Sequence, residues 1–168
     1  MPELAEVETT RRGIEPYVCG QTIARIIIRH TQLRWAVPTE IVALLKDQQF
    51  FTVQRRGKYL LFHSNIGTLI IHLGMSGCLR IVDSIATVQK HDHIDIVFTN
   101  GNCLRFTDPR RFGSIHWTTK DPLQHKLLAE LGPEPLVPAF SAKYLEGQAR
   151  NRTVPIKTFI MNSHIVVG

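Results

Sequence analysis

Pro2, Glu3 and Glu6 form the most reactive segment that the sequence offers. Pro2 follows a methionine that is normally removable, and its removal leaves a secondary amine at the N-terminus. An α-amine has a reference pKa near 8, against about 10.4 for lysine, so its neutral fraction at pH 7 is larger by a factor on the order of a few hundred. Such an amine can attack an electrophilic carbon and form an iminium, with the two carboxylates transferring protons. The alternative is structural, because proline and acidic residues are common in the first turn of a helix.

A second candidate is the basic tetrapeptide Arg55–Lys58, which lies between two expected strands. As a functional site it would clamp phosphate groups, with Lys58 near the reactive centre. As a structural element it would be a solvated hairpin turn, which is the usual role of a short charged loop. The sequence leaves both interpretations open.

Met75 and the segment Arg110–Phe112 have the residue types that contact stacked bases. Met75 lies in a glycine-rich tip, where an exposed methionine could enter a base stack, although methionine is more usual in a core. Two arginines followed by a phenylalanine on a turn resemble side chains that read and intercalate between bases. An ordinary turn with exposed arginines is the alternative for this second segment.

His91 and His93 share one face of an expected strand and could bind a metal as a pair, but no third ligand has suitable spacing. Contact of His91 with a phosphate group is the functional interpretation that we favour. The three cysteines are too few and too scattered for a disulfide scaffold or a four-thiolate zinc site. Ser76 lacks a nucleophile elbow and no phosphate-cradling loop occurs, so serine-hydrolase and nucleotide-triphosphatase functions have no support.

Hydrophobic periodicity indicates the elements that must position these residues. Residues 3–18 have apolar residues at helical spacing, and residues 38–46 begin with Pro-Thr-Glu, as short helices do. Strands are expected at 22–29, 50–54, 59–63, 68–72, 78–82, 93–98, 103–107 and 114–117, and further helices at 124–131, 141–150 and 155–162. Asn100-Gly101 is a hairpin signal. Short strands at this spacing predict an α+β protein with an antiparallel β-sandwich or barrel flanked by helices.

The composition excludes several classes of protein. The chain has 168 residues, 43% hydrophobic and 20% charged, which is a globular balance and not that of a disordered chain. No apolar run approaches the roughly 20 residues of a membrane span, and the acidic N-terminus is unlike a signal peptide, so we expect an intracellular, cytoplasmic protein. The net charge of +6 is mildly favourable for a polyanionic partner.

Seven short motifs follow one another along the chain: Met1–Leu4, Gln54–Leu61, His72–Gly77, Lys90–His93, Thr107–Gly113, Leu131–Leu136 and Pro155–Lys157. Together they resemble the formamidopyrimidine-DNA glycosylases, which are bifunctional enzymes of base-excision repair. The resemblance implies excision of oxidised purines, chiefly 8-oxoguanine and formamidopyrimidines, followed by strand cleavage through β and δ elimination. The implied partner is double-stranded DNA that contains oxidised purines or abasic sites, and we expect a monomer.

The resemblance also implies a role for each candidate residue of the catalytic centre. Pro2, once Met1 is removed, matches the nucleophile that forms a Schiff base with the damaged nucleoside. Glu3 matches the residue that transfers protons at the sugar, and Glu6 matches a second acidic residue of the same site. Lys58 matches a hairpin lysine that touches the DNA backbone beside the lesion.

The remaining candidates match contacts with DNA. Met75, Arg110 and Phe112 match the three residues that fill the void left by a flipped base, with Arg110 facing the orphaned cytosine. A planar guanidinium suits that role. His91, Arg111 and Lys157 match contacts with phosphate groups of the kinked duplex. Such residues are needed together because a base must leave the stack before an amine can reach its sugar.

The resemblance changes the expected domain organisation. We expect a catalytic β-sandwich domain at 1–131, a proline-rich linker at 132–140, and the first helices of a helix–two-turn–helix module at 141–168. The family continues to the end of that module and to a four-cysteine zinc finger, so we expect the chain to be an N-terminal portion. No cofactor is expected in this chain, and one zinc ion is implied for the full-length family member.

Two other functions stay open at this level. The first is a truncated relative that binds DNA without catalysis, because the expected module is incomplete. The second is an RNA-binding β-barrel, which would need stacking aromatic residues on adjacent strands, and only Phe98 and Phe106 qualify.

Overall fold

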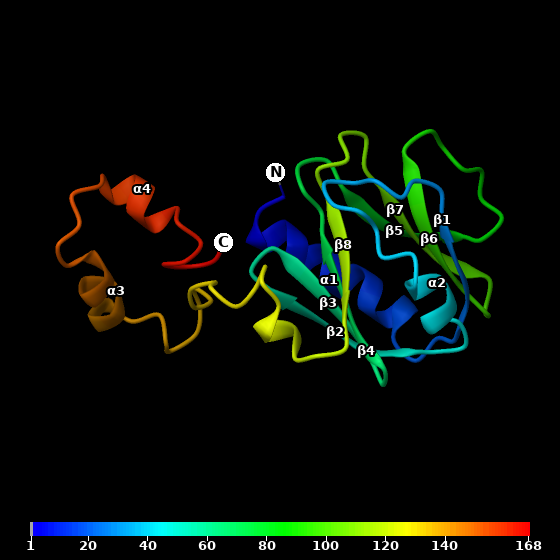
Figure 1. Cartoon of the computed structure of the whole chain (residues 1–168), viewed down its shortest axis with the longest axis horizontal. Coiled ribbons are helices and arrows are strands. Elements are labelled where there is room, and N and C mark those ends of the chain that lie inside the picture. Colours follow the sequence, from blue (N-terminus) through cyan, green and yellow to red (C-terminus); the bar gives the residue numbers. More distant parts are fainter. Residues whose placement is uncertain (1) are drawn as a thin grey trace.

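Two antiparallel sheets form the body of the protein in the computed structural model, which describes residues 2–168 (Figure 1). One sheet has the strand order β1-β6-β7-β5 and the other has the order β2-β3-β4-β8. The strands are β1 (Ile23–Ile28), β2 (Phe50–Arg56), β3 (Tyr59–Ser64), β4 (Gly67–His72), β5 (Cys78–Asp83), β6 (Asp92–Phe98), β7 (Asn102–Thr107) and β8 (Ser114–Thr118). The prediction of an α+β fold with an antiparallel β-sandwich is confirmed.

The core lies between the two sheets and contains residues of both. Along β3, Leu60 and Phe62 point inward while the alternate residues face the other side, as the period of a strand requires. The buried cluster joins residues of both sheets, including Leu60, Phe62, Leu69, Ile71, Ile94, Ile96, Leu104 and Phe106. Such a core holds the strand ends in place, and the candidate site residues lie at those ends.

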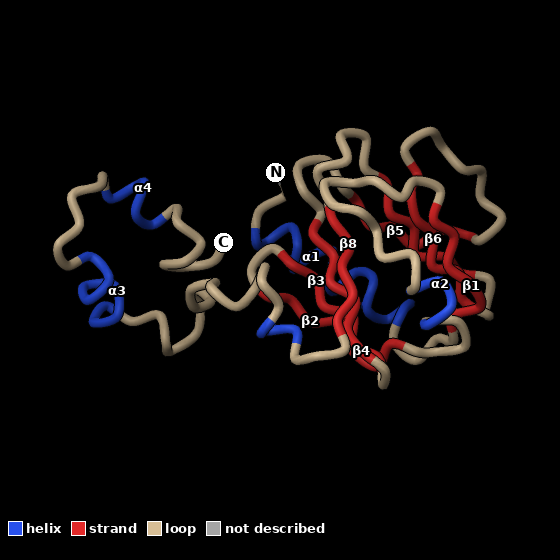
Figure 2. Tube along the Cα trace, viewed as in Figure 1, coloured by secondary structure: helices blue, strands red, loops and turns tan. Residues whose placement is uncertain are grey.

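Helix α1 (Leu4–Val18) packs beside the sheets and fixes the start of the chain (Figure 2). Val7, Ile14 and Val18 are buried, as the spacing predicts. Glu3 is the N-cap residue, and its backbone N–H donates to Glu6 Oε2 at 2.7 Å. The acidic first turn is therefore a helix cap as well as a candidate catalytic segment.

One predicted helix is wrong. Gln124 ends a short 3₁₀ helix η1 (Pro122–Gln124), and residues 125–130 form a bend and turns and not an α-helix. His125, which follows η1, has extended backbone geometry, and this interrupts helical hydrogen bonding. The bent segment instead packs Leu128 against Leu61 and Ile70 on the outer face of the β2-β3-β4-β8 sheet. Burial of apolar surface decides the conformation here over helix propensity.

The other predicted helices exist but are shorter than expected: α2 (Ile41–Leu44), α3 (Ala142–Ala149) and α4 (Ile156–Ile160). Ser141 caps α3 by accepting the N–H of Tyr144 at 3.1 Å. In Figure 1 the part of the chain with α3 and α4 lies to one side of the sandwich. The division at residues 131 and 140 stays a prediction.

Glu134 connects the proline-rich segment to the hairpin between β2 and β3. Its carboxylate accepts hydrogen bonds from Arg55 Nη1 at 2.6 Å, Arg56 Nη1 at 3.2 Å and the Gly57 N–H at 2.7 Å. Burial opposes ionisation of this carboxyl, but these donors outweigh it and lower its pKa. Arg56 also donates to the carbonyl oxygens of Leu131 and Gly132. The hairpin and the segment after residue 131 are therefore held together by charged hydrogen bonds.

We expect Glu134→Ala to lower the free energy of unfolding by about 2–3 kcal/mol, because it removes the carboxylate shared by two largely buried guanidinium groups and the Gly57 N–H. Denaturation by urea at pH 7 measures the change. The matched control is Glu146→Ala, whose ion pair with Arg150 is more than 70% exposed on both sides. That variant should lose less than about 0.5 kcal/mol. Equal losses in the two variants would contradict the role given to Glu134.

Candidate active site

Pro2, Glu3 and Lys58 are brought together at the start of α1. Lys58 lies at the tip of the β2–β3 hairpin, and its Nζ donates to Glu3 Oε2 at 2.7 Å. Pro2 is partly buried and lines a cavity of about 400 Å³ together with Glu6, Met75 and others. Two segments distant in sequence, the β2–β3 hairpin and the segment with Met75, therefore converge on the N-terminal residues.

The electrostatics of this cluster favour an ionised Glu3. The hydrogen bond and the positive charge of Lys58 lower the pKa of the Glu3 carboxyl. The Glu3 side chain is 63% exposed, whereas that of Lys58 is only 16% exposed. A carboxylate in this state can accept a proton from a group that binds beside it. Glu6 lines the cavity next to Pro2, and its carboxylate already accepts the N–H of Glu3.

Met75, Arg110 and Phe112 lie on two neighbouring loops. Met75 is in the β4–β5 loop (residues 73–77), and the other two are in the β7–β8 loop (residues 108–113). The side chains of Met75 and Phe112 are about half exposed and line one cavity with Arg34 and His72. The Arg110 guanidinium lies 4.8 Å from the centre of the Phe112 ring. The predicted trio thus forms one exposed rim with an apolar and a cationic side.

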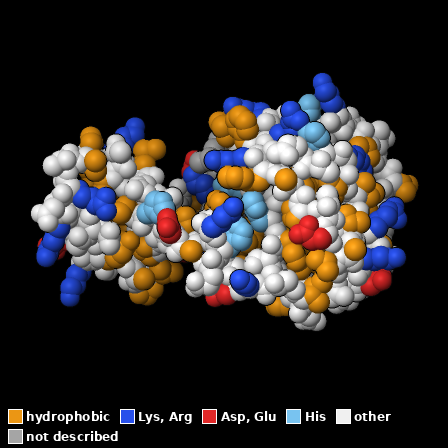
Figure 3. Space-filling model, viewed as in Figure 1, with side chains coloured by type: hydrophobic (Ala, Val, Ile, Leu, Met, Phe, Trp, Pro, Cys, Tyr) orange, Lys and Arg blue, Asp and Glu red, His pale blue; other side chains and the backbone are white. Residues whose placement is uncertain are grey.

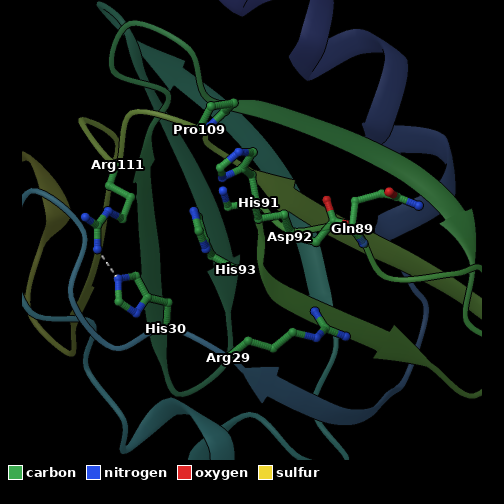
Figure 4. A pocket seen from close by; sticks show the side chains of 9 residues that line it. Arg29, His30, Gln89, His91, Asp92, His93, Pro109 and Arg111 are labelled. Carbon is green, nitrogen blue, oxygen red and sulfur yellow. Dashed lines mark hydrogen bonds between the residues drawn. The ribbon is translucent and has the colours of Figure 1, made fainter.

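His91 and Arg111 line a third cavity, with an approximate volume of 390 Å³ (Figure 4). Arg111 contacts the imidazole of His30. The rings of His30, His93 and His91 form a row, in which the ring centre of His93 lies 5.5 Å from that of His30 and 6.4 Å from that of His91. His93 Nε2 donates to the Asp108 carbonyl oxygen at 2.8 Å, so His93 holds the start of the β7–β8 loop. His91, Arg111 and the neighbouring Lys90 leave donors and positive charge at the cavity wall.

Two of the candidate groups lie apart from these clusters. Lys157 is exposed on α4, and Figure 1 shows that α4 lies to one side of the sandwich that carries the other candidates. Arg55 and Arg56 turn toward Glu8 and Glu134 and are largely buried. Of the basic tetrapeptide, the structure therefore aims only Lys58 at the reactive cluster.

Sequence reasoning missed His72 as a site residue, although it begins the glycine-rich motif. Burial, together with the charges of Arg34 and Lys58, lowers the pKa of His72 to about 4. Its Nδ1 accepts the Gly74 N–H at 3.0 Å, and its ring lies 4.7 Å from that of Tyr59. His72 lines two cavities, one together with Lys58 and the other together with Met75. It therefore lies between the cluster around Lys58 and the exposed rim. Basic and histidine side chains gather on this part of the sandwich, which faces the C-terminal segment (Figure 3).

Comparison with known proteins decides the family. The family model for the formamidopyrimidine-DNA glycosylase N-terminal domain matches residues 1–115, which include most of the candidate residues. The chain belongs to the formamidopyrimidine-DNA glycosylase family. Formamidopyrimidine-DNA glycosylase from Nitrosococcus oceani is 54% identical over all 168 residues, and that from Yersinia enterocolitica is 52% identical. The chain spans 62% of the length of each of these curated relatives.

Solved structures of the family agree with the fold. The glycosylase from Lactococcus lactis, non-covalently bound to DNA containing an abasic site, superposes with a TM-score of 0.91 at 32% identity. The match covers 99% of this chain and 65% of that one. A complex of the wild-type Lactococcus lactis enzyme with DNA containing N7-benzyl-Fapy-dG gives a TM-score of 0.90, also at 32% identity.

Residues 2–168 offer no group of three or more His, Cys, Asp and Glu side chains that could hold a metal ion. The zinc that the resemblance implies for full-length members therefore finds no ligand set among the described residues. Over the same range, no helix has the length and apolar character needed to cross a membrane.

We expect Lys58→Met to raise the pKa of Glu3 toward the ordinary value of a glutamate. The lysine stabilises the charged form of the carboxyl, so its removal makes protonation easier at a given pH. Titration of the Glu3 carboxyl carbon by NMR measures the midpoint. Arg150→Met, which removes a distant positive charge, is the matched control and should leave that midpoint in place. A midpoint that does not move in Lys58→Met would show that the ion pair is absent in solution.

Proposed function

We propose that this protein excises oxidised purines from double-stranded DNA and then cleaves the strand as an abasic-site lyase. The observation that carries the proposal is the convergence of Pro2, Glu3 and Lys58 beside a rim of Met75, Arg110 and Phe112. Such a reaction needs a nucleophile, a group that transfers protons, and a wedge, that is, side chains that enter the duplex and occupy the place of the flipped base.

The chemistry starts at the amine of Pro2 after removal of Met1, which lies outside the described residues. The amine nitrogen attacks the anomeric carbon of the damaged nucleoside, and the base leaves with the electron pair of its glycosidic bond. Glu3, held ionised by Lys58, exchanges protons at the sugar as the ring opens to a Schiff base. Removal of a C2′ proton then expels the 3′ phosphate in the β elimination, and removal of the C4′ proton expels the 5′ phosphate in the δ elimination. Hydrolysis of the remaining Schiff base by water releases the sugar fragment as an aldehyde and restores the Pro2 amine.

The exposed rim provides what base flipping requires. The side chain of Met75 and the stacked pair of Arg110 and Phe112 are in position to fill the space of the extruded nucleotide, with the guanidinium toward the opposite cytosine. His91, Arg111 and, from α4, Lys157 would bind phosphate groups along the duplex. The relatives bound to DNA with N7-benzyl-Fapy-dG and with an abasic site support formamidopyrimidines and abasic sites as substrates. We propose 8-oxoguanine as a further substrate from the resemblance to the family. The protein would act as a monomer on chromosomal DNA in the cytoplasm.

DNA binding without catalysis is the second candidate. The chain spans 62% of the length of its curated relatives, so more than a third of each relative has no counterpart in these 168 residues. A protein of this kind would bind an abasic duplex but form no covalent adduct.

Borohydride trapping separates the two candidates. We expect the 168-residue chain, with its N-terminal mass checked for loss of Met1, to form a covalent adduct with an abasic-site duplex. Mass spectrometry of the digested adduct should place the modification on Pro2. An adduct on Lys58 would refute the assigned nucleophile, and retarded DNA without any adduct would support binding alone.

Substitution of Glu3 tests the proton-transfer step. Glu3→Gln should slow excision of 8-oxoguanine under single-turnover conditions by about 100-fold, which is the usual contribution of a positioned acid or base. Glu146→Gln on the exposed face of α3 is the control and should react like the unmodified chain. Equal rates for Glu3→Gln and the unmodified chain would remove Glu3 from the mechanism.

A further inference from the structure

Asp108 is a completely buried carboxylate at the base of the β7–β8 loop. Two residues near the start of β6 fix its backbone. The Asp108 N–H donates to the carbonyl oxygen of His91, which precedes β6, at 3.0 Å, and the Asp108 carbonyl oxygen accepts from Nε2 of His93 in β6 at 2.8 Å. Asp108 is not among the residues that line the cavities described above. A buried carboxylate without a catalytic partner needs a structural explanation.

The two oxygens of this carboxylate hold two different loops. Oδ1 accepts the hydroxyl hydrogen of Ser76 at 2.6 Å, and Ser76 belongs to the β4–β5 loop. Oδ2 accepts the N–H of Gly113 at 2.8 Å, at the far end of the β7–β8 loop. Ser76 Oγ in turn accepts the N–H of Arg110 at 3.2 Å. A continuous chain of hydrogen bonds therefore runs from the backbone of Arg110 through Ser76 to Asp108.

The two loops also touch backbone to backbone. A Cβ atom on Gly74 would lie 2.4 Å from the nitrogen of Gly113 and 2.4 Å from the carbonyl carbon of Phe112, so no side chain fits there. Arg111 has a positive φ of 57°, which is rare for a residue other than glycine, and its N–H donates to the Asp108 carbonyl oxygen at 3.2 Å. The β7–β8 loop is thus held in an unusual conformation against the β4–β5 loop.

We infer that Asp108, acting through Ser76, is a positioning residue that holds Met75 and Arg110–Phe112 as one rigid wedge and thereby sets the preference for the base opposite the lesion. This inference rests on the proposed function, because it assumes that the rim enters the duplex. The side chains of the wedge are exposed, and their backbones are fixed from below by the buried carboxylate. A guanidinium can select one base only if its anchor does not move.

Ser76→Ala is the decisive variant. Asp108→Ala would leave the N–H of Gly113 buried without an acceptor, so it would test folding more than the hydrogen bonds between the two loops. Removal of the Ser76 hydroxyl removes the hydrogen bonds that join Arg110, Ser76 and Asp108, but it leaves the hydrogen bond from Gly113 to Asp108. Ser76→Thr keeps a hydroxyl and serves as the rescue. Ser84→Ala, just beyond the opposite end of β5, is the matched control.

The readout is binding to duplexes that carry a tetrahydrofuran abasic analogue opposite cytosine or adenine, which needs no catalysis. We expect the unmodified chain and Ser84→Ala to prefer cytosine by about tenfold, in the range of one good contact with a base, and Ser76→Ala to prefer it by less than about twofold. Ser76→Thr should recover most of the preference. In the free protein, amide hydrogen exchange of Arg110 should accelerate in Ser76→Ala, while that of Gly113 should not.

These measurements separate the inference from the proposed function. If the unmodified chain prefers cytosine but forms no covalent adduct, the proposed catalysis is refuted and the inference about Asp108 and Ser76 still stands. An unmodified chain without a preference, a Ser76→Ala variant with its preference intact, or an unchanged exchange rate at Arg110 would each overturn the inference, whatever the trapping experiment gives.

Discussion

The contact between Lys58 and Glu3 is the interaction on which the candidate active site depends. It joins the tip of the β2–β3 hairpin to the first turn of α1, which are 55 residues apart in sequence. On one side, Glu6 fixes the backbone of Glu3 as part of the helix cap. On the other, Glu134 fixes the hairpin through Arg55 and the Gly57 N–H. The position of the carboxylate beside Pro2 is therefore the result of three charged groups that lie in different segments.

Much of the positive charge of the chain is used inside the molecule. Arg55 and Arg56 pair with Glu8 and Glu134, and the buried Arg105 binds Asp95 with two nitrogens at 2.9 Å. Such guanidinium groups are held by internal carboxylates and are not available to an external anion. The cations that remain at the surface of the candidate site come from other positions, chiefly the β7–β8 loop and the residues around His91. The net charge of the sequence says little about this distribution, because it counts paired and free groups alike.

Local patterns in the sequence predicted the strands well, because alternation of buried and exposed residues is a property of neighbouring positions. The helix expected at 124–131 failed because contacts of Leu128 with Leu61 and Ile70, which lie more than 50 residues away, decide its conformation. The inward orientation of Arg55 and the link between Ser76 and Asp108 have the same origin in long-range contacts. Motifs could identify Pro2, Met75 and Arg110 as candidates by resemblance, but not the buried groups that hold them.

The close approach of the two rim loops has a consequence for how the surface can vary. At Gly74 a side chain would collide with the backbone of the facing loop, and at Gly113 it would collide with Phe106 and the His72 carbonyl oxygen. The side chains of Met75, Arg110 and Phe112, in contrast, are exposed. Substitutions at these exposed positions can therefore change the charge and polarity of the rim without disturbing the backbone contact between the two loops. The buried contact between the loops restricts residue type at Gly74 and Gly113, whereas the exposed positions of the rim carry no such steric restriction.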